Sequence, residues 1–257
     1  MLYNYHTHTK RCKHALGEDR EYVENAIKVG IKTLGFSDHA PYCFPDTVYR
    51  SSYRMADEEI FEYAESVRSL KKEYAKDIDI LLGFELEYYP RYHKIEMKFL
   101  NQVNPDYLIL GQHFIGNEVE NIQHAYNTKI DRLEEYVSQV IEGINTGDFA
   151  YVAHPDMIYP FACEDKKLIK EYTRLCEYAK KVGMPLELNL LGVMGNRHYP
   201  SNKFFEIAGK VGNSIVIGYD AHDPISFLNE QAVKQANAMI EKYNLKAIKT
   251  PFISVKG

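Results

Sequence analysis

The feature that most constrains this chain is an alternation of short apolar segments with amphipathic segments, repeated along its 257 residues. The apolar segments have the length and composition of buried strands, and they lie at residues 3–8, 33–39, 78–84, 107–113, 149–153, 186–190 and 215–220. Apolar residues spaced three and four positions apart predict helices, which lie at residues 18–29, 57–74, 95–100, 130–144, 168–183, 201–208 and 225–242. The chain is therefore expected to be an α/β protein.

The repeats follow one another without a linker, which predicts a single domain over residues 1–257. Strands that alternate with helices form parallel sheets, because each helix returns the chain to the same end of the sheet. Seven such repeats favour a closed or nearly closed barrel, and an open sheet with helices on both faces is the alternative. Residues 41–55 are polar and contain proline, so we expect a functional loop there.

Histidine and acidic side chains stand at the ends of six of the seven predicted strands. Alternate residues of a strand point to one face, so His6 and His8 project together from the first strand. Barrel enzymes build their sites at the C-terminal ends of strands, so we expect these side chains to meet. The candidates are His6, His8, His14, His39, Glu85, His113, His154, Asp220 and His222.

A metal cluster is the economical reason for these groups to converge. Imidazoles and carboxylates gathered in a partly dry pocket repel one another or lose hydration unless a cation holds them. Nine candidate ligands exceed the coordination of one ion, and a carboxylate can bridge two ions. The sequence thus predicts two or three metal ions. For each histidine alone, a hydrogen-bonded structural role is the alternative.

Composition excludes several function classes. The net charge of −5 argues against a nucleic-acid-binding surface, which would be basic. The N-terminus has no signal-peptide pattern, and no apolar run approaches the roughly 18 residues of a membrane span. Four scattered cysteines without paired spacing (Cys12, Cys43, Cys163 and Cys176) are typical of reduced thiols in the cytoplasm.

The residues now named resemble the successive motifs of the polymerase and histidinol phosphatase (PHP) superfamily. The matching segments, in order along the whole chain, are His6-Thr7-His8, His14, Asp38-His39, Gly83-Phe84-Glu85, His113, Ala153-His154-Pro155 and Asp220-Ala221-His222. The resemblance implies a distorted (β/α)7 TIM-like barrel and three divalent ions, for which Zn, Fe and Mn are all suitable.

The resemblance also implies which residues hold each ion. The first ion would take His6, His8, Glu85 and Asp220, and the second would take Glu85, His113 and His154, so that Glu85 bridges the two. The third would take His14, His39 and His222. Glu85, Asp220 and His222 are also the predicted catalytic residues.

Within the superfamily, the chain is most similar to the monofunctional histidinol-phosphate phosphatases. The similarity lies in the loop with Tyr53-Arg54-Met55, in Gly111-Gln112-His113-Phe114 and in Asn196-Arg197-His198-Tyr199-Pro200. This implies hydrolysis of L-histidinol phosphate to L-histidinol and phosphate, in histidine biosynthesis, by attack of a hydroxide that bridges two metals. The expected partner is a small phosphate monoester, with no nucleic acid and no membrane.

Substrate-binding residues are predicted from their chemistry. Arg197 is the first candidate to bind phosphate, because a guanidinium matches two phosphate oxygens at once, and Arg54 is the second. Asp38 precedes a predicted ligand and is expected to orient one. Tyr42, Phe114 and Glu118 are candidates to recognise the imidazole or the amine. A scaffold or surface role is the alternative for each.

Three other functions remain open at this point. A phosphodiesterase or exonuclease acting on nucleotides would share the metal cluster. An amidohydrolase also begins with a His-x-His strand, although its metals are usually bridged by a modified lysine. A non-catalytic accessory module would be expected to lose ligands, whereas this chain retains all nine.

Overall fold

The computed structural model describes residues 1–120 and 123–251, which divide into two compact units. The first unit comprises residues 1–86, 90–109 and 218–230, and the second comprises residues 87–89, 110–217 and the chain from 231 onward. Each unit is described by itself below. The prediction of one domain over residues 1–257 stays a prediction.

The first unit is built on a parallel sheet with the order β1-β2-β3-β4. These strands are β1 (Tyr3–Asn4), β2 (Thr33–His39), β3 (Asp79–Leu86) and β4 (Tyr107–Leu110), whose last residue belongs to the second unit. The register of β2 and β3 runs from Thr33 opposite Asp79 to His39 opposite Glu85. The two polar strand ends therefore lie side by side.

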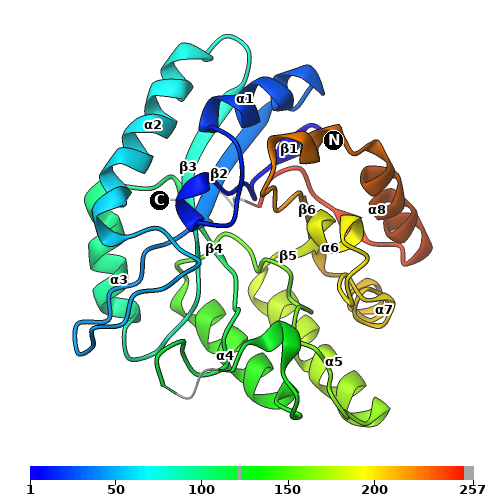
Figure 1. The fold of residues 1–257 in the computed structure, drawn as a ribbon. Coiled ribbons are helices and arrows are strands. Elements are labelled where there is room, and N and C mark those ends of the chain that lie inside the picture. Colours follow the sequence, from blue (N-terminus) through cyan, green and yellow to red (C-terminus); the bar gives the residue numbers. More distant parts are fainter. Residues whose placement is uncertain (121–122, 252–257) are drawn as a thin grey trace. The chain divides into compact units, whose positions relative to one another are not determined.

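Helices α1 (Asp19–Lys28), α2 (Ile60–Glu73) and α3 (His93–Leu100) belong to the same unit. A capping box between Glu18 and Glu21 starts α1, and Gly30 follows its end with a φ of 84°. The apolar face of α2, which includes Val67 and Leu70, is buried, and α2 packs on α1 and β3 (Figure 1). Short 3-10 helices cover Lys10–Cys12, Asp57–Glu59, Asn101–Val103 and Pro224–Leu228.

Tyr107 shows how tightly the first unit is packed. Its Oη lies 2.8 Å from the carbonyl oxygen of Tyr5 and 3.1 Å from that of Phe36. A Cβ atom at Gly35 would lie 2.2 Å from this Oη, and one at Gly83 would lie 2.5 Å from the ring. These two glycines are therefore required for the ring to lie under the sheet.

The second unit has strands β5 (Leu186–Asn189), β6 (Ser214–Gly218) and β7 (Lys246–Ala247) in the order β5-β6-β7. The last residue of β6, Gly218, belongs to the first unit. Its helices are α4 (Leu133–Thr146), α5 (Asp165–Val182), α6 (Leu190–Met194), α7 (Asn202–Val211) and α8 (Glu230–Lys242), of which Glu230 belongs to the first unit. A 3-10 helix covers Ala125–Asn127. Helix α5 packs on α4 and α7 (Figure 1).

The expected strand at residues 149–153 is wrong as a full strand. Only Val152 pairs, in parallel bridges to Leu110 and Leu186. The chain leaves the sheet at His154, which has a φ of 29°, and Pro155 offers no N–H to continue the ladder. This segment nevertheless keeps its place between β4 and β5.

Other boundaries also differ from the prediction. The first strand shrinks to Tyr3–Asn4 plus a parallel bridge between Thr7 and Ala221, and the fourth ends at Leu110. The expected helix over 225–242 is broken at Asn229 into a 3-10 turn and α8, because the backbone there turns to a ψ of 78°. Helix α6 and strand β7 were not predicted, because both are too short to show a period.

Candidate metal centre

The side chains of His6, His8, Glu85 and Asp220 converge in the first unit. His6 Nε2 lies 3.1 Å from His8 Nε2, 3.5 Å from Asp220 Oδ1 and 3.6 Å from Glu85 Oε2. His8 Nε2 lies 3.1 Å from Asp220 Oδ1 and 3.5 Å from Glu85 Oε2. All four side chains are buried, with exposures between 0% and 5%.

The backbone brings these residues together from distant parts of the sequence. The His8 N–H donates to the Ala221 carbonyl at 2.9 Å, and the Ala221 N–H donates to the His6 carbonyl at 3.2 Å. This parallel bridge places Asp220 beside His6, and Asp220 adopts a φ of 51°. Aspartate is among the non-glycine residues that adopt the left-handed region most readily, and the neighbouring bridge holds Asp220 there.

A second group in the same unit consists of His14, His39 and His222. Their nearest ring nitrogens lie within 4.8 Å of one another, and His14 Nε2 is 3.0 Å from His222 Nε2. His39 Nδ1 also lies 3.0 Å from Glu85 Oε2, which links this group to the first. His14 is exposed and His222 half-buried, so this side of the cluster is open to solvent.

The carboxylate of Asp38 contacts His8 and the backbone of His39. Its Oδ1 lies 3.3 Å from His8 Nδ1 and accepts the His39 N–H at 2.8 Å, and its Oδ2 accepts a bond from the Thr9 hydroxyl. The carboxylate directs His8 Nε2 toward Asp220, which is the arrangement expected around a metal ligand. The sequence did not identify Cys12, which is buried and close to His8 and His222.

The electrostatics of the first unit are strongly coupled. Burial alone would raise the pKa of the Asp220 carboxyl, but the imidazoles of His6, His8 and His222 lower this pKa well below its ordinary value. Burial alone would lower the pKa of His8, but hydrogen bonds to Asp220 and Asp38 raise it well above its ordinary value. An ionised Asp220 among imidazoles is the charge state that a cation site requires.

The donor set fits a divalent metal. Four ligand atoms at about 2.1 Å from a tetrahedral ion lie roughly 3.4 Å from one another. The two imidazole nitrogens here lie 3.1 Å from each other and 3.1–3.6 Å from an oxygen of each carboxylate. Two imidazole nitrogens 3.1 Å apart can share only one proton, so at least one of the two is unprotonated. Mixed imidazole and carboxylate donors suit Zn, Fe and Mn.

The second unit carries its own pair of histidines, His113 and His154, with ring centroids 5.0 Å apart. His113 Nδ1 lies 3.0 Å from Glu87 Oε1, and the His154 N–H donates to Glu187 Oε2 at 2.9 Å. Asn189 donates to the same oxygen of Glu187 at 2.9 Å. Glu187 thereby holds the left-handed backbone at His154.

Glu87 and Glu187 are two buried carboxylates that the sequence analysis did not single out, with exposures of 1% and 0%. Glu187 lies inside an apolar strand segment and Glu87 directly follows β3, and buried carboxylates need a partner. Glu87 contacts the ring of His113, and Glu187 accepts the backbone N–H of His154.

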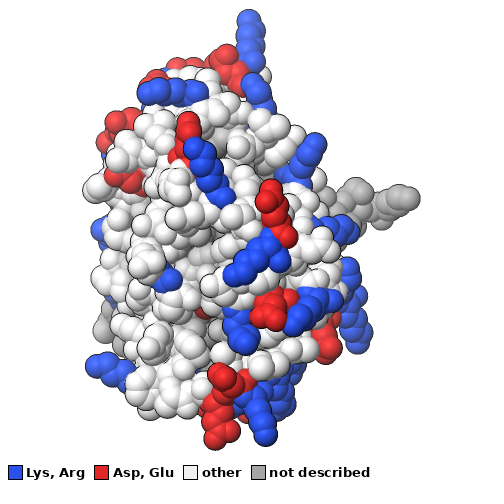
Figure 2. Space-filling model, turned by 90° about the vertical axis from the view of Figure 1, so that its right-hand side faces the viewer, with Lys and Arg blue, Asp and Glu red and all other residues white. Residues whose placement is uncertain are grey.

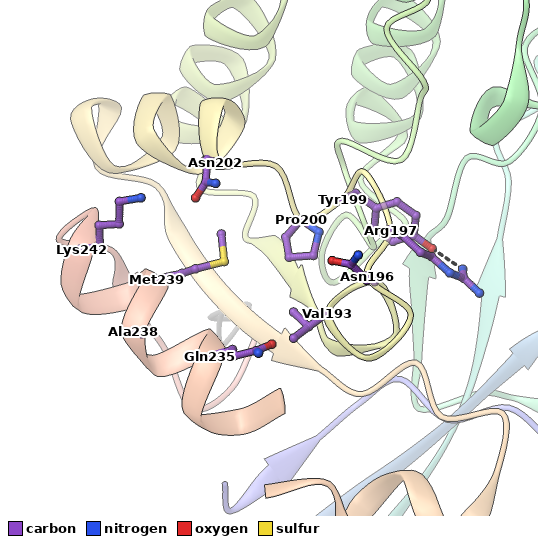
Figure 3. Close-up of a pocket in the computed structure, with 11 residues that line it drawn as sticks. Val193, Asn196, Arg197, Tyr199, Pro200, Asn202, Gln235, Ala238, Met239 and Lys242 are labelled. Atoms are coloured by element: carbon purple, nitrogen blue, oxygen red, sulfur yellow. Dashed lines mark hydrogen bonds between the residues drawn. The ribbon is translucent and has the colours of Figure 1, made fainter. Parts of the chain in front are cut away.

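Arg197 is exposed and lies among aromatic rings of the second unit. Its guanidinium carbon is 5.6 Å from the ring centroid of Tyr126 and 5.8 Å from that of Tyr199, and its Nη1 donates to Tyr199 Oη at 2.7 Å. A cavity of about 400 Å³ lies between this loop and α8, and Arg197 points away from α8 toward Tyr199 (Figure 3). The rings restrict the guanidinium to a fixed plane.

The other predicted substrate residues are less exposed. Arg54 is 2% exposed and donates from Nη1 to the Ala40 carbonyl at 3.1 Å, with its charge above the Tyr42 ring. Tyr42, Phe114 and Glu118 are all buried. These positions show packing roles, and substrate binding by these residues stays a prediction.

The chain matches known proteins over most of its length. The sequence profile of the PHP domain matches residues 4–190. A protein of Deinococcus radiodurans named "Probable histidinol-phosphatase" is 28% identical over 239 residues, which cover 90% of this chain and 90% of the relative. The histidinol-phosphatase of Bacillus subtilis is 25% identical over 250 residues, covering 84% of this chain and 92% of the relative.

A solved structure shares the fold. The histidinol phosphate phosphatase of Lactococcus lactis, crystallised with Zn, L-histidinol and phosphate, superposes with a TM-score of 0.75 at 18% identity, covering 97% of this chain and 96% of that one. The predicted fold class, a distorted α/β barrel, is confirmed by this likeness, and the open two-sided sheet is not the fold.

Proposed function

This chain belongs to the PHP domain family, and on that premise we propose that it is a metal-dependent histidinol-phosphatase. The reaction is the hydrolysis of a phosphate monoester, with L-histidinol phosphate as substrate and L-histidinol and phosphate as products. The names of the relatives from Deinococcus radiodurans and Bacillus subtilis support this substrate. A role in histidine biosynthesis follows from the same names, and a location in the cytoplasm is a further part of the proposal.

The observation that carries the proposal is the geometry of His6, His8, Glu85 and Asp220. Two buried imidazole nitrogens 3.1 Å apart lie 3.1–3.6 Å from an oxygen of each carboxylate, which is the spacing of a single coordination sphere. The two nitrogens face each other and can share only one proton, whereas a metal ion would accept a lone pair from both. The site is arranged for a cation and therefore for chemistry on an anionic substrate.

We extend the proposal to three ions with the ligand sets that the family resemblance implies. His6, His8, Glu85 and Asp220 would hold one, and His14, His39 and His222 would hold another, as the distances within the first unit support. His113 and His154, with Glu85, would hold the remaining ion. The alignment of His113 by Glu87 supports a ligand role for that imidazole.

Bound divalent ions supply a water of lowered pKa near 7 and neutralise phosphate oxygens. The residues of the chain do the rest. Arg197, held in one plane by Tyr126 and Tyr199, offers two N–H groups to two phosphate oxygens. Asp38 keeps the His8 tautomer whose Nε2 faces Asp220, and Glu187 keeps the backbone at His154 in position.

A nucleotide phosphodiesterase is the runner-up, and it has less support. On the face shown in Figure 2, Lys and Arg side chains are interspersed with Asp and Glu and form no continuous basic stripe. A long nucleic acid would need such a stripe to follow its backbone.

In the described part of the chain, no helix combines the length and the apolar character of a membrane span.

The test is an assay of phosphate release by the purified, metal-analysed protein. L-histidinol phosphate is compared with a sugar phosphate, a nucleoside monophosphate and a phosphodiester. The proposal expects kcat/KM for L-histidinol phosphate to exceed the others by at least about 100-fold, the worth of one or two hydrogen bonds to charged groups. Equal turnover of all monoesters would reject the substrate, and preference for the diester would favour the runner-up.

A further inference from the structure

His124 lies in the second unit next to His113, on a short antiparallel pairing. The pairing joins Phe114 to His124, and its backbone bonds run from Ala125 N to the His113 carbonyl at 2.7 Å and from Ile115 N to the Gln123 carbonyl at 2.9 Å. The ring centroids of His124 and His113 are 6.3 Å apart. The backbone therefore holds this imidazole beside one of the proposed metal ligands.

The hydrogen bonds of His124 determine its tautomer. Its Nδ1 accepts the backbone N–H of Tyr126 at 3.2 Å, and a nitrogen that accepts carries no proton. A neutral imidazole with an unprotonated Nδ1 carries its proton on Nε2. His124 thus presents a single N–H donor whose position in the ring is settled by the backbone.

Among the residues that the structure describes, no atom accepts a hydrogen bond from Nε2 of His124. The ring is half-buried against Phe114, with centroids 5.0 Å apart. A half-buried ring whose Nε2–H meets no acceptor among these residues is suited to bind an acceptor supplied by a ligand.

The surroundings identify the acceptor as an oxyanion. Tyr126, whose N–H fixes the His124 tautomer, also lies under the guanidinium of Arg197 at 5.6 Å. His113 and His154, the proposed ligands of one ion, complete the same group of residues. A neutral N–H donor next to a guanidinium and a metal-binding pair is complementary to phosphate oxygens, which only accept hydrogen bonds.

We propose that the Nε2–H of His124 donates a hydrogen bond to a phosphoryl oxygen of the substrate and positions the phosphate together with Arg197. This inference rests on the proposed phosphatase function of the same site. It assigns His124 as a substrate-positioning residue, a role that its place outside the predicted strand ends did not reveal.

The competing explanation is that His124 only caps the 3-10 helix Ala125–Asn127 by accepting the Tyr126 N–H. Two substitutions separate the roles, because the amide of Asn reaches the place of Nδ1 and the amide of Gln reaches the place of Nε2. His124→Asn keeps the capping acceptor and removes the distal donor. His124→Gln restores a distal N–H and loses the cap.

The experiment measures KM, the inhibition constant of inorganic phosphate, the melting temperature and the metal content of both variants. We expect His124→Asn to raise KM and the phosphate inhibition constant about 10- to 100-fold, the worth of a hydrogen bond to a charged group, at wild-type metal content. His124→Gln should stay within about threefold of wild type in both constants. Wild-type constants for His124→Asn, or equal losses in both variants, would overturn the inference.

A measurement on the wild-type protein protects the test against a variant that fails to fold. Histidine-selective ¹⁵N NMR of the Zn-loaded protein should show a protonated Nε2 on His124 that shifts when inorganic phosphate is added. A protonated Nδ1, or a signal that phosphate leaves unchanged, would overturn the inference. Because inorganic phosphate has no leaving group, these readouts stand even where the assay rejects histidinol phosphate as the substrate.

Discussion

The two units of this protein carry different halves of the candidate chemistry. In the first unit, carboxylates and imidazoles converge on one another. The single carboxylate of Glu85 lies within 3.6 Å of three imidazoles, those of His6, His8 and His39. In the second unit, Glu87 contacts the ring of His113, Glu187 accepts the backbone N–H of His154, and an exposed arginine stands among aromatic rings. The first arrangement gathers candidate ligands for cations. The second consists of separate side chains, each of which is oriented by its own contacts.

This difference teaches how each part would respond to change. A shared ligand such as Glu85 affects several contacts at once, so its loss is not compensated locally. A group such as Arg197 makes separable contacts, so its loss should remove one interaction and leave the rest. The predictions below test this contrast, from the largest expected effect to the smallest.

Glu85→Gln should abolish most of the activity. The amide cannot supply a negative charge to the cations, and the partial positive charge of its N–H groups repels the cations. We expect kcat/KM to fall by at least about 1,000-fold and the metal content to drop, measured by phosphate release and elemental analysis. Glu73→Gln on α2, which changes an exposed ion pair with Arg20 of α1, is the matched control. A metal-replete and active Glu85→Gln protein would remove the central role of this residue.

Arg197→Ala should weaken substrate binding without loss of metal. The expected fall in kcat/KM is about 10- to 150-fold, mainly through KM, which corresponds to a charged hydrogen bond of roughly 1.5–3 kcal/mol. Arg20→Ala, which removes an exposed arginine of the first unit, should leave the kinetics unchanged. An unchanged KM for Arg197→Ala would show that the aromatic cage holds the arginine for structure alone.

Asp38→Asn should reduce metal affinity about 10- to 100-fold, because His8 loses the carboxylate that orients its ring. Titration of the metal-free protein with Zn, followed by calorimetry, measures the change. Asp77→Asn, at an exposed position in the loop before β3, provides the control. Affinity equal to that of the wild type would show that the Asp38 carboxylate is not needed to orient His8.

Glu96 should make stability depend on pH in the direction opposite to a paired carboxylate. Burial raises the pKa of the Glu96 carboxyl to about 8, and the N–H of Cys43 and the charge of Arg54 only partly offset this. The folded form therefore retains a proton that the unfolded form loses above pH 4.5, so stability falls as pH rises from about 4.5 to about 8.

Glu96→Gln should remove this dependence. The difference in unfolding free energy between variant and wild type should increase by up to about 1.4 kcal/mol per pH unit across that window, as measured by urea denaturation at a series of pH values. A constant difference between the two proteins would show that Glu96 is ionised when folded. The comparison with Asp220 is direct, because both carboxyls are buried in the first unit, where imidazoles lower the pKa of Asp220 and burial raises the pKa of Glu96.

The sequence predicted the elements that have a clear period. Helices α1, α2, α4 and α5 lie close to their predicted positions, because their buried residues repeat every three to four positions. The structure of the segment at 149–153 was harder to predict, since a segment with a single bridging residue has the same apolar pattern as a full strand. Helix α6 has only five residues and shows no period.

The candidate site was predictable where ligands follow strands. His6, His8 and Glu85 stand at strand ends, and such ends meet in parallel folds. Glu87, Glu187 and His124 were missed, because their roles depend on which atom each faces. Position along the chain does not reveal that His124 accepts the Tyr126 N–H and so carries its proton on Nε2.

The sequence by itself determined the fold class, the kinds of candidate metal ligand and their order along the chain. These follow from residue type and periodicity, which are local properties. Only the tertiary structure decided the distances within the cluster, the left-handed backbone at His154 and Asp220, and the orientation of each imidazole. Those depend on pairing between segments as far apart as Thr7 and Ala221, which no local pattern encodes.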